Sequence, residues 1–149
     1  MTAINDQILT GIRSLLLLFE DLTDVVSDRI TPNQFASDDQ QQPSVMMELR
    51  ECTQQNTLDR TSCLVTGTLV LTIRSKDDIL CDQIAESIRS QNTSPSTGLD
   101  GYSGGAGDGE LIGSERTDFD TSIVYDDDGD ETDLYDSVQV YRIHYVIRG

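Results

Sequence analysis

Six carboxylates crowd into a short run near the C-terminal end of the chain, the densest group of side chains that could hold a ligand. They are Asp126, Asp127, Asp128, Asp130, Glu131 and Asp133. Calcium prefers oxygen ligands, and an EF-hand loop places them at positions 1, 3 and 5, with glycine at 6 and glutamate at 12. Neither register fits, because Gly129 at position 6 puts Val124 at position 1, whereas Asp126 at position 1 puts Glu131 at position 6. We therefore predict a solvated acidic turn over residues 126–136, with a loose cation site as the alternative.

Groups that could act in catalysis are sparse. His144 is the only histidine, and it lies in an alternating segment with Arg142 and Arg148 on the same face. No serine or cysteine stands beside it in the sequence as a nucleophile would. We predict a structural or surface histidine and expect that the chain is not an enzyme.

Other ligand-binding motifs are weak. The glycine-rich stretch Gly104–Glu110 resembles one imperfect copy of a calcium-binding nonapeptide, but such repeats act in stacks. The sequence has no phosphate-binding G-x-x-x-x-G-K-[ST] motif and no G-x-G-x-x-G after a strand. Cys52, Cys63 and Cys81 form no C-x-x-C pair and no metal-ligand pattern. No cofactor or metal is therefore expected.

The charge of the chain limits its partners. The 149 residues carry a net charge of −17, with 20 aspartates, seven glutamates and Lys76 as the single lysine. Such a surface repels nucleic-acid phosphates and anionic membranes, so neither is an expected partner. Aspartate-rich, lysine-poor composition resembles that of proteins from organisms that accumulate salt in the cytosol, where the Debye length falls to about 3 Å at 1 M. A disordered acidic tail is the alternative, but the acidity is spread along the whole chain.

Targeting signals are not apparent. The longest clean apolar run, Leu15–Phe19, is far shorter than the roughly 20 residues of a membrane span. The N-terminus lacks the pattern of a secretory signal, so we expect a protein made and kept in the cytosol.

Apolar periodicity predicts the elements that position these groups. Three- and four-residue spacing indicates helices over about 4–26 and 76–90, the second capped by Ser75. Period-two alternation predicts strands near 45–52, 62–74, 117–125 and 137–148.

The buried face of this sheet should carry seven apolar or aromatic residues: Val65, Leu69, Leu71, Ile73, Tyr141, Ile143 and Tyr145. Residues 92–113 are predicted to be a flexible loop. The expected fold is α+β in the order α-β-β-α-β-β, a mainly antiparallel four-stranded sheet with two helices packed on one face, in a single domain over residues 1–149.

Four stretches carry a resemblance to a known family. They are Val25–Ile30 before a proline-containing connector, Pro43–Met47 entering the first strand, Gly67–Arg89 from strand into helix, and the closing strand Val140–Val146. Together with the element order they resemble the tail terminator family of long-tailed viruses, also called tail-completion or minor tail proteins. The long 92–113 loop, the acidic turn and the absence of tryptophan depart from that pattern.

The resemblance implies a virion protein that assembles in the host cytoplasm. Such a protein would form a homo-oligomeric ring, a hexamer, at the head-proximal end of the tail tube. It would end tube polymerisation and join the tail tube protein to the head–tail connector, while DNA passes through without specific binding. The acidic turn would then line the channel or lie at an interface. A head–tail stopper or adaptor ring, and a non-viral acidic binding protein of a halophile, are the alternatives.

Overall fold

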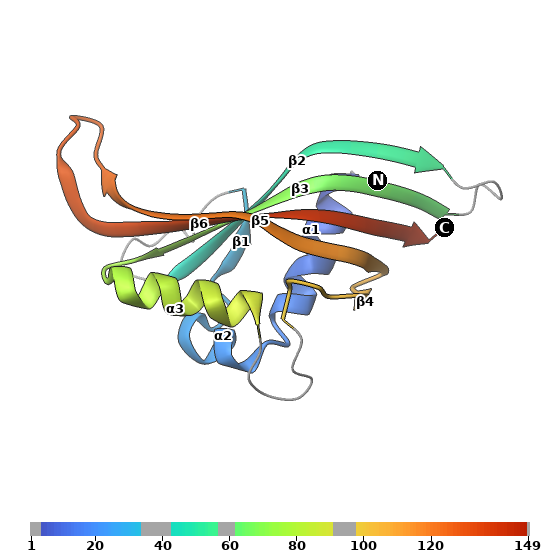
Figure 1. The fold of residues 1–149 in the computed structure, drawn as a ribbon, viewed down its shortest axis with the longest axis horizontal. Helices are drawn as coiled ribbons and strands as arrows, with labels where there is room; N and C mark the ends of the chain where they lie inside the picture. The colour runs from blue at the N-terminus through green and yellow to red at the C-terminus, as the bar shows by residue number, and fades with distance from the viewer. Residues whose placement is uncertain (1–3, 34–42, 57–61, 91–97, 149) are drawn as a thin grey trace.

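The computed structural model describes residues 4–33, 43–56, 62–90 and 98–148 (Figure 1). Its helices are α1 (Ile4–Leu16), α2 (Glu20–Val26) and α3 (Asp78–Arg89). Its strands are β1 (Ile30–Pro32), β2 (Ser44–Asn56), β3 (Ser62–Ser75), β4 (Gly104–Ala106), β5 (Gly109–Tyr125) and β6 (Glu131–Arg148).

The strands form one six-stranded sheet in the order β1-β2-β3-β6-β5-β4. The pairs formed by the four long strands are antiparallel, whereas β1 runs parallel to β2 and pairs Ile30 with Val45. The predicted α+β fold, with a four-stranded antiparallel sheet and two helices, is therefore wrong. Over its described residues the protein is mostly β, with a mixed six-stranded sheet and three helices. Strands β1 and β4 have three residues each, which is too short for alternation to reveal them.

The helix predicted over residues 4–26 is two helices. The Leu18 N–H bonds to the Leu15 carbonyl and the Phe19 N–H to the Leu16 carbonyl, which tightens the last turn and ends α1. Leu18 is left 75 % exposed, whereas Phe19 and Leu22 are buried on either side of the start of α2. Because the buried residues keep three- and four-residue spacing across the break, the sequence pattern does not reveal the break.

The second predicted helix is confirmed as α3, but its cap differs. The Ile79 N–H donates to Asp77 Oδ1 at 2.9 Å, so Asp77 is the N-cap instead of Ser75. The Ser75 hydroxyl, two residues before the cap, accepts a bond from the Asp77 N–H at 3.1 Å. Ser75 therefore orders the turn that leads from β3 into the helix.

The predicted core face of the sheet is confirmed. All seven residues named for it are at most 1 % exposed. In Figure 1, α2 and α3 lie on one side of the sheet, and α1 contacts β1, β2, β4 and β5. Since successive side chains of a strand point to opposite faces, the alternate residues of β2, β3 and β6 form a second face. We call this side, opposite the core, the open face.

The segment predicted as a loop over residues 92–113 holds ordered elements in its described part, and residues 92–97 lie outside the described residues. Strand β4 pairs with the first residues of β5, so that Ala106 lies opposite Gly109. Gly107, with φ +67°, makes the tight turn between them. The Leu99 N–H bonds to the Ile88 carbonyl, which ties the approach to this hairpin to the end of α3.

Candidate functional site

The six candidate carboxylates lie at and beside the tip of the hairpin formed by β5 and β6 (Figure 1, orange, far left). Strand β3 ends at Ser75, opposite Tyr135, whereas β5 and β6 continue to the pair Tyr125–Glu131. Residues 123–134 of the hairpin therefore pair only with each other and, through Ile123, with Tyr135. We call them the arm.

The tip of the arm is ordered by one of its own carboxylates. Asp126 Oδ1 accepts bonds from the N–H groups of Asp128 at 3.0 Å and Asp130 at 2.9 Å. The Asp126 backbone bonds to Gly129 and Asp130, and Gly129 takes φ +84°, which glycine adopts without strain. Asp126 is therefore a structural residue of the turn, while Asp127 and Asp128 point their charge to solvent.

The carboxylates of the arm do not converge on one point. Asp127, Asp128, Asp130 and Asp133 are exposed, and Asp133 lies 4.0 Å from Lys76. Across the described ranges of the chain, no three histidine, cysteine or acidic side chains are grouped to hold a metal ion. The geometry therefore offers no support for the alternative of a cation site at the turn.

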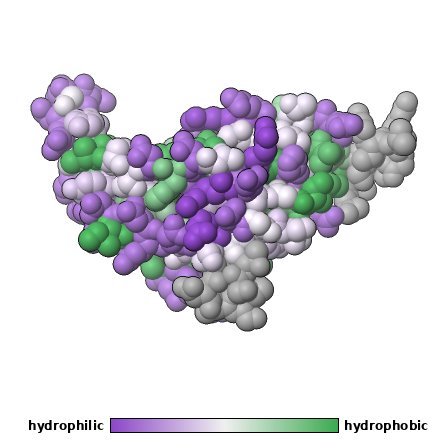
Figure 2. Space-filling view, viewed as in Figure 1, coloured by the Kyte–Doolittle hydropathy of each residue, from purple (hydrophilic) through white to green (hydrophobic). Residues whose placement is uncertain are grey.

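Apolar side chains lie on the arm and at its base. Tyr125 is 57 % exposed, and Ile123, Val124, Leu134 and Tyr135 are half-buried. In Figure 2, hydrophobic atoms lie at the base of this projection and hydrophilic atoms cover its tip. A two-stranded ribbon without further packing is marginally stable in water. An arm with this composition gains stability when another surface covers it.

Replacing Asp126 by alanine is expected to loosen the arm without unfolding the sheet. The change removes the carboxylate oxygen that accepts two backbone N–H bonds, a loss of about 1 kcal/mol of local stability. Amide hydrogen exchange across residues 123–134 should accelerate about fivefold. Asp127→Ala is the matched control, since the Asp127 side chain is exposed on the same turn. Equal exchange in the two variants would show that Asp126 does not order the tip.

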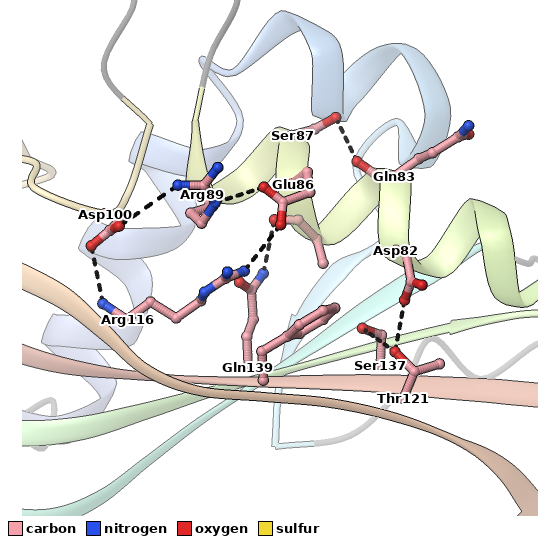
Figure 3. A network of polar contacts seen from close by, with 12 residues as sticks. Asp82, Gln83, Glu86, Ser87, Arg89, Asp100, Arg116, Thr121, Ser137 and Gln139 are labelled. Carbon is pink, nitrogen blue, oxygen red and sulfur yellow. Dashed lines mark hydrogen bonds and ion pairs between the residues drawn. The ribbon is translucent and has the colours of Figure 1, made fainter.

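A polar network joins α3 to the base of the hairpin (Figure 3). Glu86 pairs with Arg89 at 2.6 Å and with Arg116 of β5 at 3.5 Å. The Arg116 guanidinium also lies 4.9 Å from the centre of the Phe119 ring. The hydrogen bond and charge of Glu86 raise the pKa of Arg89. Asp100 accepts a bond from the Arg116 N–H at 3.1 Å, so the network also holds the segment that precedes β4.

A second part of the network is buried in the core. Gln139 is fully buried on β6, where its Nε2 donates to the Ala85 carbonyl at 3.3 Å. The Tyr141 hydroxyl donates to Gln139 Oε1 at 2.9 Å, and burial raises the pKa of Tyr141. Nearer the surface, Thr121 of β5 donates to the exposed Asp82 of α3 at 2.7 Å. Because each of these side chains has a hydrogen-bond partner, the network indicates a structural role for them. Sequence reasoning missed Gln139, although a glutamine on the apolar face of β6 signals a buried hydrogen bond.

The contacts of His144 and of the three cysteines indicate structural roles for these residues. His144 Nδ1 lies 3.1 Å from the Thr66 hydroxyl and is half-buried on the open face. All three cysteines are free thiols. Burial, reinforced by the Asp136 charge, raises the pKa of Cys81 to about 12, and its Sγ donates to the Tyr135 carbonyl at 3.3 Å. A thiol that stays protonated is a poor nucleophile.

One cavity of about 430 Å³ lies between α1 and the β4–β5 hairpin. Its lining mixes glycines and polar residues with two larger side chains: Gln7, Thr10, Gly11, Ser14, Gly107, Asp108, Gly109, Tyr145 and Ile147. Gly11 and Gly107 approach closely here, and the Tyr145 hydroxyl donates to the Ala106 carbonyl. The arrangement is that of a tight helix–hairpin contact.

No helix in the described parts of the chain is long and apolar enough to cross a membrane.

Comparison with known proteins finds a solved structure with a similar fold. The chain is similar to one in a solved structure described as the virion of a native gene transfer agent particle, with a TM-score of 0.54 and 13 % identity. The match covers 97 % of this chain and 95 % of that chain. No protein-family model and no curated protein matches the sequence. The likeness shows that this chain shares its fold with that chain over nearly its full length.

Proposed function

We propose that this protein is a structural component of a tailed, phage-like particle. The observation that carries the proposal is the fold shared, end to end, with a chain of a gene transfer agent virion. A fold alone does not specify function, since unrelated functions occur on the same fold. The arm adds an independent argument, because its exposed aromatic and half-buried apolar side chains suit a protein that works against other subunits.

Within the particle, the proposed place is the head-proximal end of the tail tube. The protein forms a closed ring there, a hexamer, ends tube polymerisation and presents a surface to the head–tail connector. The four stretches that resemble tail terminators support this place. A ring requires a head-to-tail contact between different surfaces that closes on itself. The acidic exterior repels phosphates, which suits a channel that passes DNA without holding it. On this proposal the chain is not an enzyme.

A head–tail stopper or adaptor ring is the second candidate, since it shares the ring and the virion location but contacts the connector and not the tube. A binding protein of a halophile with no virion role is the third candidate, favoured only by the aspartate-rich composition. The three differ in assembly state and in their effect on tail tubes.

The purified chain in about 2 M NaCl is expected to form a ring of one size, because screening at that concentration suppresses repulsion between acidic copies. Sedimentation and negative-stain microscopy measure this directly. Added to polymerising tail tube protein, the ring should cap the tubes and stop their growth. Rings that leave tube growth unchanged would favour the stopper or adaptor. A monomer or dimer at every salt concentration would refute the virion ring.

A further inference from the structure

Strand β5 has a long outer edge. It pairs with β6 on its inner side, whereas β4 covers its outer side only from Gly109 to Leu111. Among the described residues, no strand pairs with that outer side from Ile112 to Tyr125. A strand edge of this length offers a row of backbone N–H and C=O groups to a strand of another molecule, which leads to edge-to-edge aggregation. We call the outer side of residues 112–125 the β5 edge.

Backbone hydrogen bonds show which groups of β5 point outward. The Ser114 carbonyl accepts a bond from the Gly101 N–H at 2.7 Å, so Ser114 faces away from β6. Outward-facing residues alternate along a strand of an antiparallel pair, which places the Arg116 N–H on the same edge. The register shift that follows Arg116 moves the alternation by one residue. The next outward N–H groups are therefore those of Phe119 and Thr121.

Each of these three outward N–H groups donates to an aspartate. The Arg116 N–H donates to Asp100 Oδ1 at 3.1 Å (Figure 3), the Phe119 N–H to Asp118 Oδ1 at 2.9 Å and the Thr121 N–H to Asp120 Oδ1 at 2.9 Å. Asp118 and Asp120 are exposed, so their carboxylates lie at the surface where an incoming strand would pair. Three successive donors of the β5 edge are thus already occupied by carboxylates.

The opposite edge of the sheet is interrupted by other means. Strand β1 covers only three residues of β2 and ends in Pro32, which has no N–H to offer. Beyond β1, the register of β2 shifts between Arg50 and Thr53, and Glu51 takes φ +55°. A bulge bends the strand and breaks the regular row of donors along its edge. A second strand would therefore find no regular ladder across this part of β2.

Charge alone does not protect these edges at high ionic strength. At 1 M salt the Debye length is about 3 Å, so repulsion between two acidic copies is screened beyond direct contact. A hydrogen bond from a backbone N–H to a carboxylate acts at contact and persists under that screening. Aspartate suits this role at positions 118 and 120, since its short side chain bonds readily to a neighbouring backbone N–H.

We infer that Asp100, Asp118 and Asp120 cap the β5 edge and prevent a strand of a second copy from pairing there. We call these residues the edge aspartates. The inference goes beyond the proposed function, because it holds for any assembly state of the chain. It also narrows the proposed ring, since neighbouring copies would then meet through side-chain surfaces and not through a sheet continued across the β5 edge.

Removal of two caps tests the inference. The variant that combines Asp118→Ala with Asp120→Ala frees the outward N–H groups of Phe119 and Thr121. In about 2 M NaCl it should associate beyond the parent assembly at about a tenfold lower protein concentration than the parent chain does. Sedimentation velocity measures this association. Amide exchange at Phe119 and Thr121 should slow in the associated form, because new bonds between strands protect these groups.

Three further variants isolate the cause. Asp127→Ala with Asp128→Ala removes the same charge from the tip of the arm and should associate as the parent does. Asp118→Asn with Asp120→Asn removes the charge but keeps an oxygen acceptor, and should also resemble the parent. Thr121→Pro, added to the double-alanine variant, deletes one outward N–H and should reverse most of the association. Circular dichroism checks that each variant is folded.

The outcomes separate this inference from the proposed function. A double-alanine variant that associates no more than the arm control would overturn the capping. If the asparagine variant associates as strongly as the double-alanine variant, charge and not the hydrogen bond keeps copies apart, and the capping is wrong. A parent chain that never forms a ring would refute the proposed function, while comparison of the variants would still decide the capping.

Discussion

Replacing Gly11 by valine is expected to lower the free energy of unfolding by about 3 kcal/mol, the upper part of the usual range for overpacking. A Cβ at this position would lie 2.3 Å from the Tyr145 hydroxyl and 2.4 Å from the Ala106 carbonyl. The carbonyl is backbone and cannot rotate away, so α1 must move off the β4–β5 hairpin. The hydrogen bond between Tyr145 and Ala106 would be lost with it.

Urea unfolding of the Gly11→Val variant measures this loss. Gly105→Ala is the control, since a Cβ there meets no atom within 4 Å and the backbone keeps an ordinary φ. A Gly11 variant as stable as the control would show that α1 does not contact the hairpin as described. The helix propensity gained on replacing glycine, up to about 1 kcal/mol, is too small to offset the clash.

Raising NaCl from about 0.1 M to about 3 M is expected to raise the melting temperature by roughly 10 °C. The 27 acidic and 10 basic residues leave a net charge of −17, and the Debye length shrinks from about 10 Å to below 3 Å over this range. A gain of about 3 kcal/mol from screening corresponds to a shift of this size in a chain of 149 residues.

Two controls separate screening from the general effects of a concentrated solute. Sucrose at matched water activity stabilises compact states by exclusion and screens nothing. A variant in which exposed Asp127, Asp128, Asp130 and Asp133 are asparagine should gain less from salt than the parent chain. A flat or falling melting temperature in NaCl would contradict the adaptation to high salt inferred from composition.

Local rules account for the parts of the fold that the sequence predicted. Alternation in β3 and β6 identified all seven core residues, because a period of two assigns a face to each residue whatever the partner strand is. The helix over Asp78–Arg89 was predicted within two residues. Its cap was misplaced since serine and aspartate at neighbouring positions cap equally well, and only the backbone geometry selects Asp77.

The sequence alone thus determined the core face, the presence of four long strands, the presence of an acidic turn between the last two and the net charge. The bounds were less accurate, because β5 begins at Gly109 instead of near 117 and β6 begins at Glu131 instead of near 137, so the turn predicted over 126–136 ends at residue 130. Tertiary structure decided the split of the first helix, the pairing of β1 and β4, and the arm that projects past β3. It also decided that Arg50 and Arg142 share one row, although they are far apart in the chain. The physical reason is that periodicity reports which face of an element is buried, whereas the order of strands and the point where each loses its neighbour depend on long-range pairing.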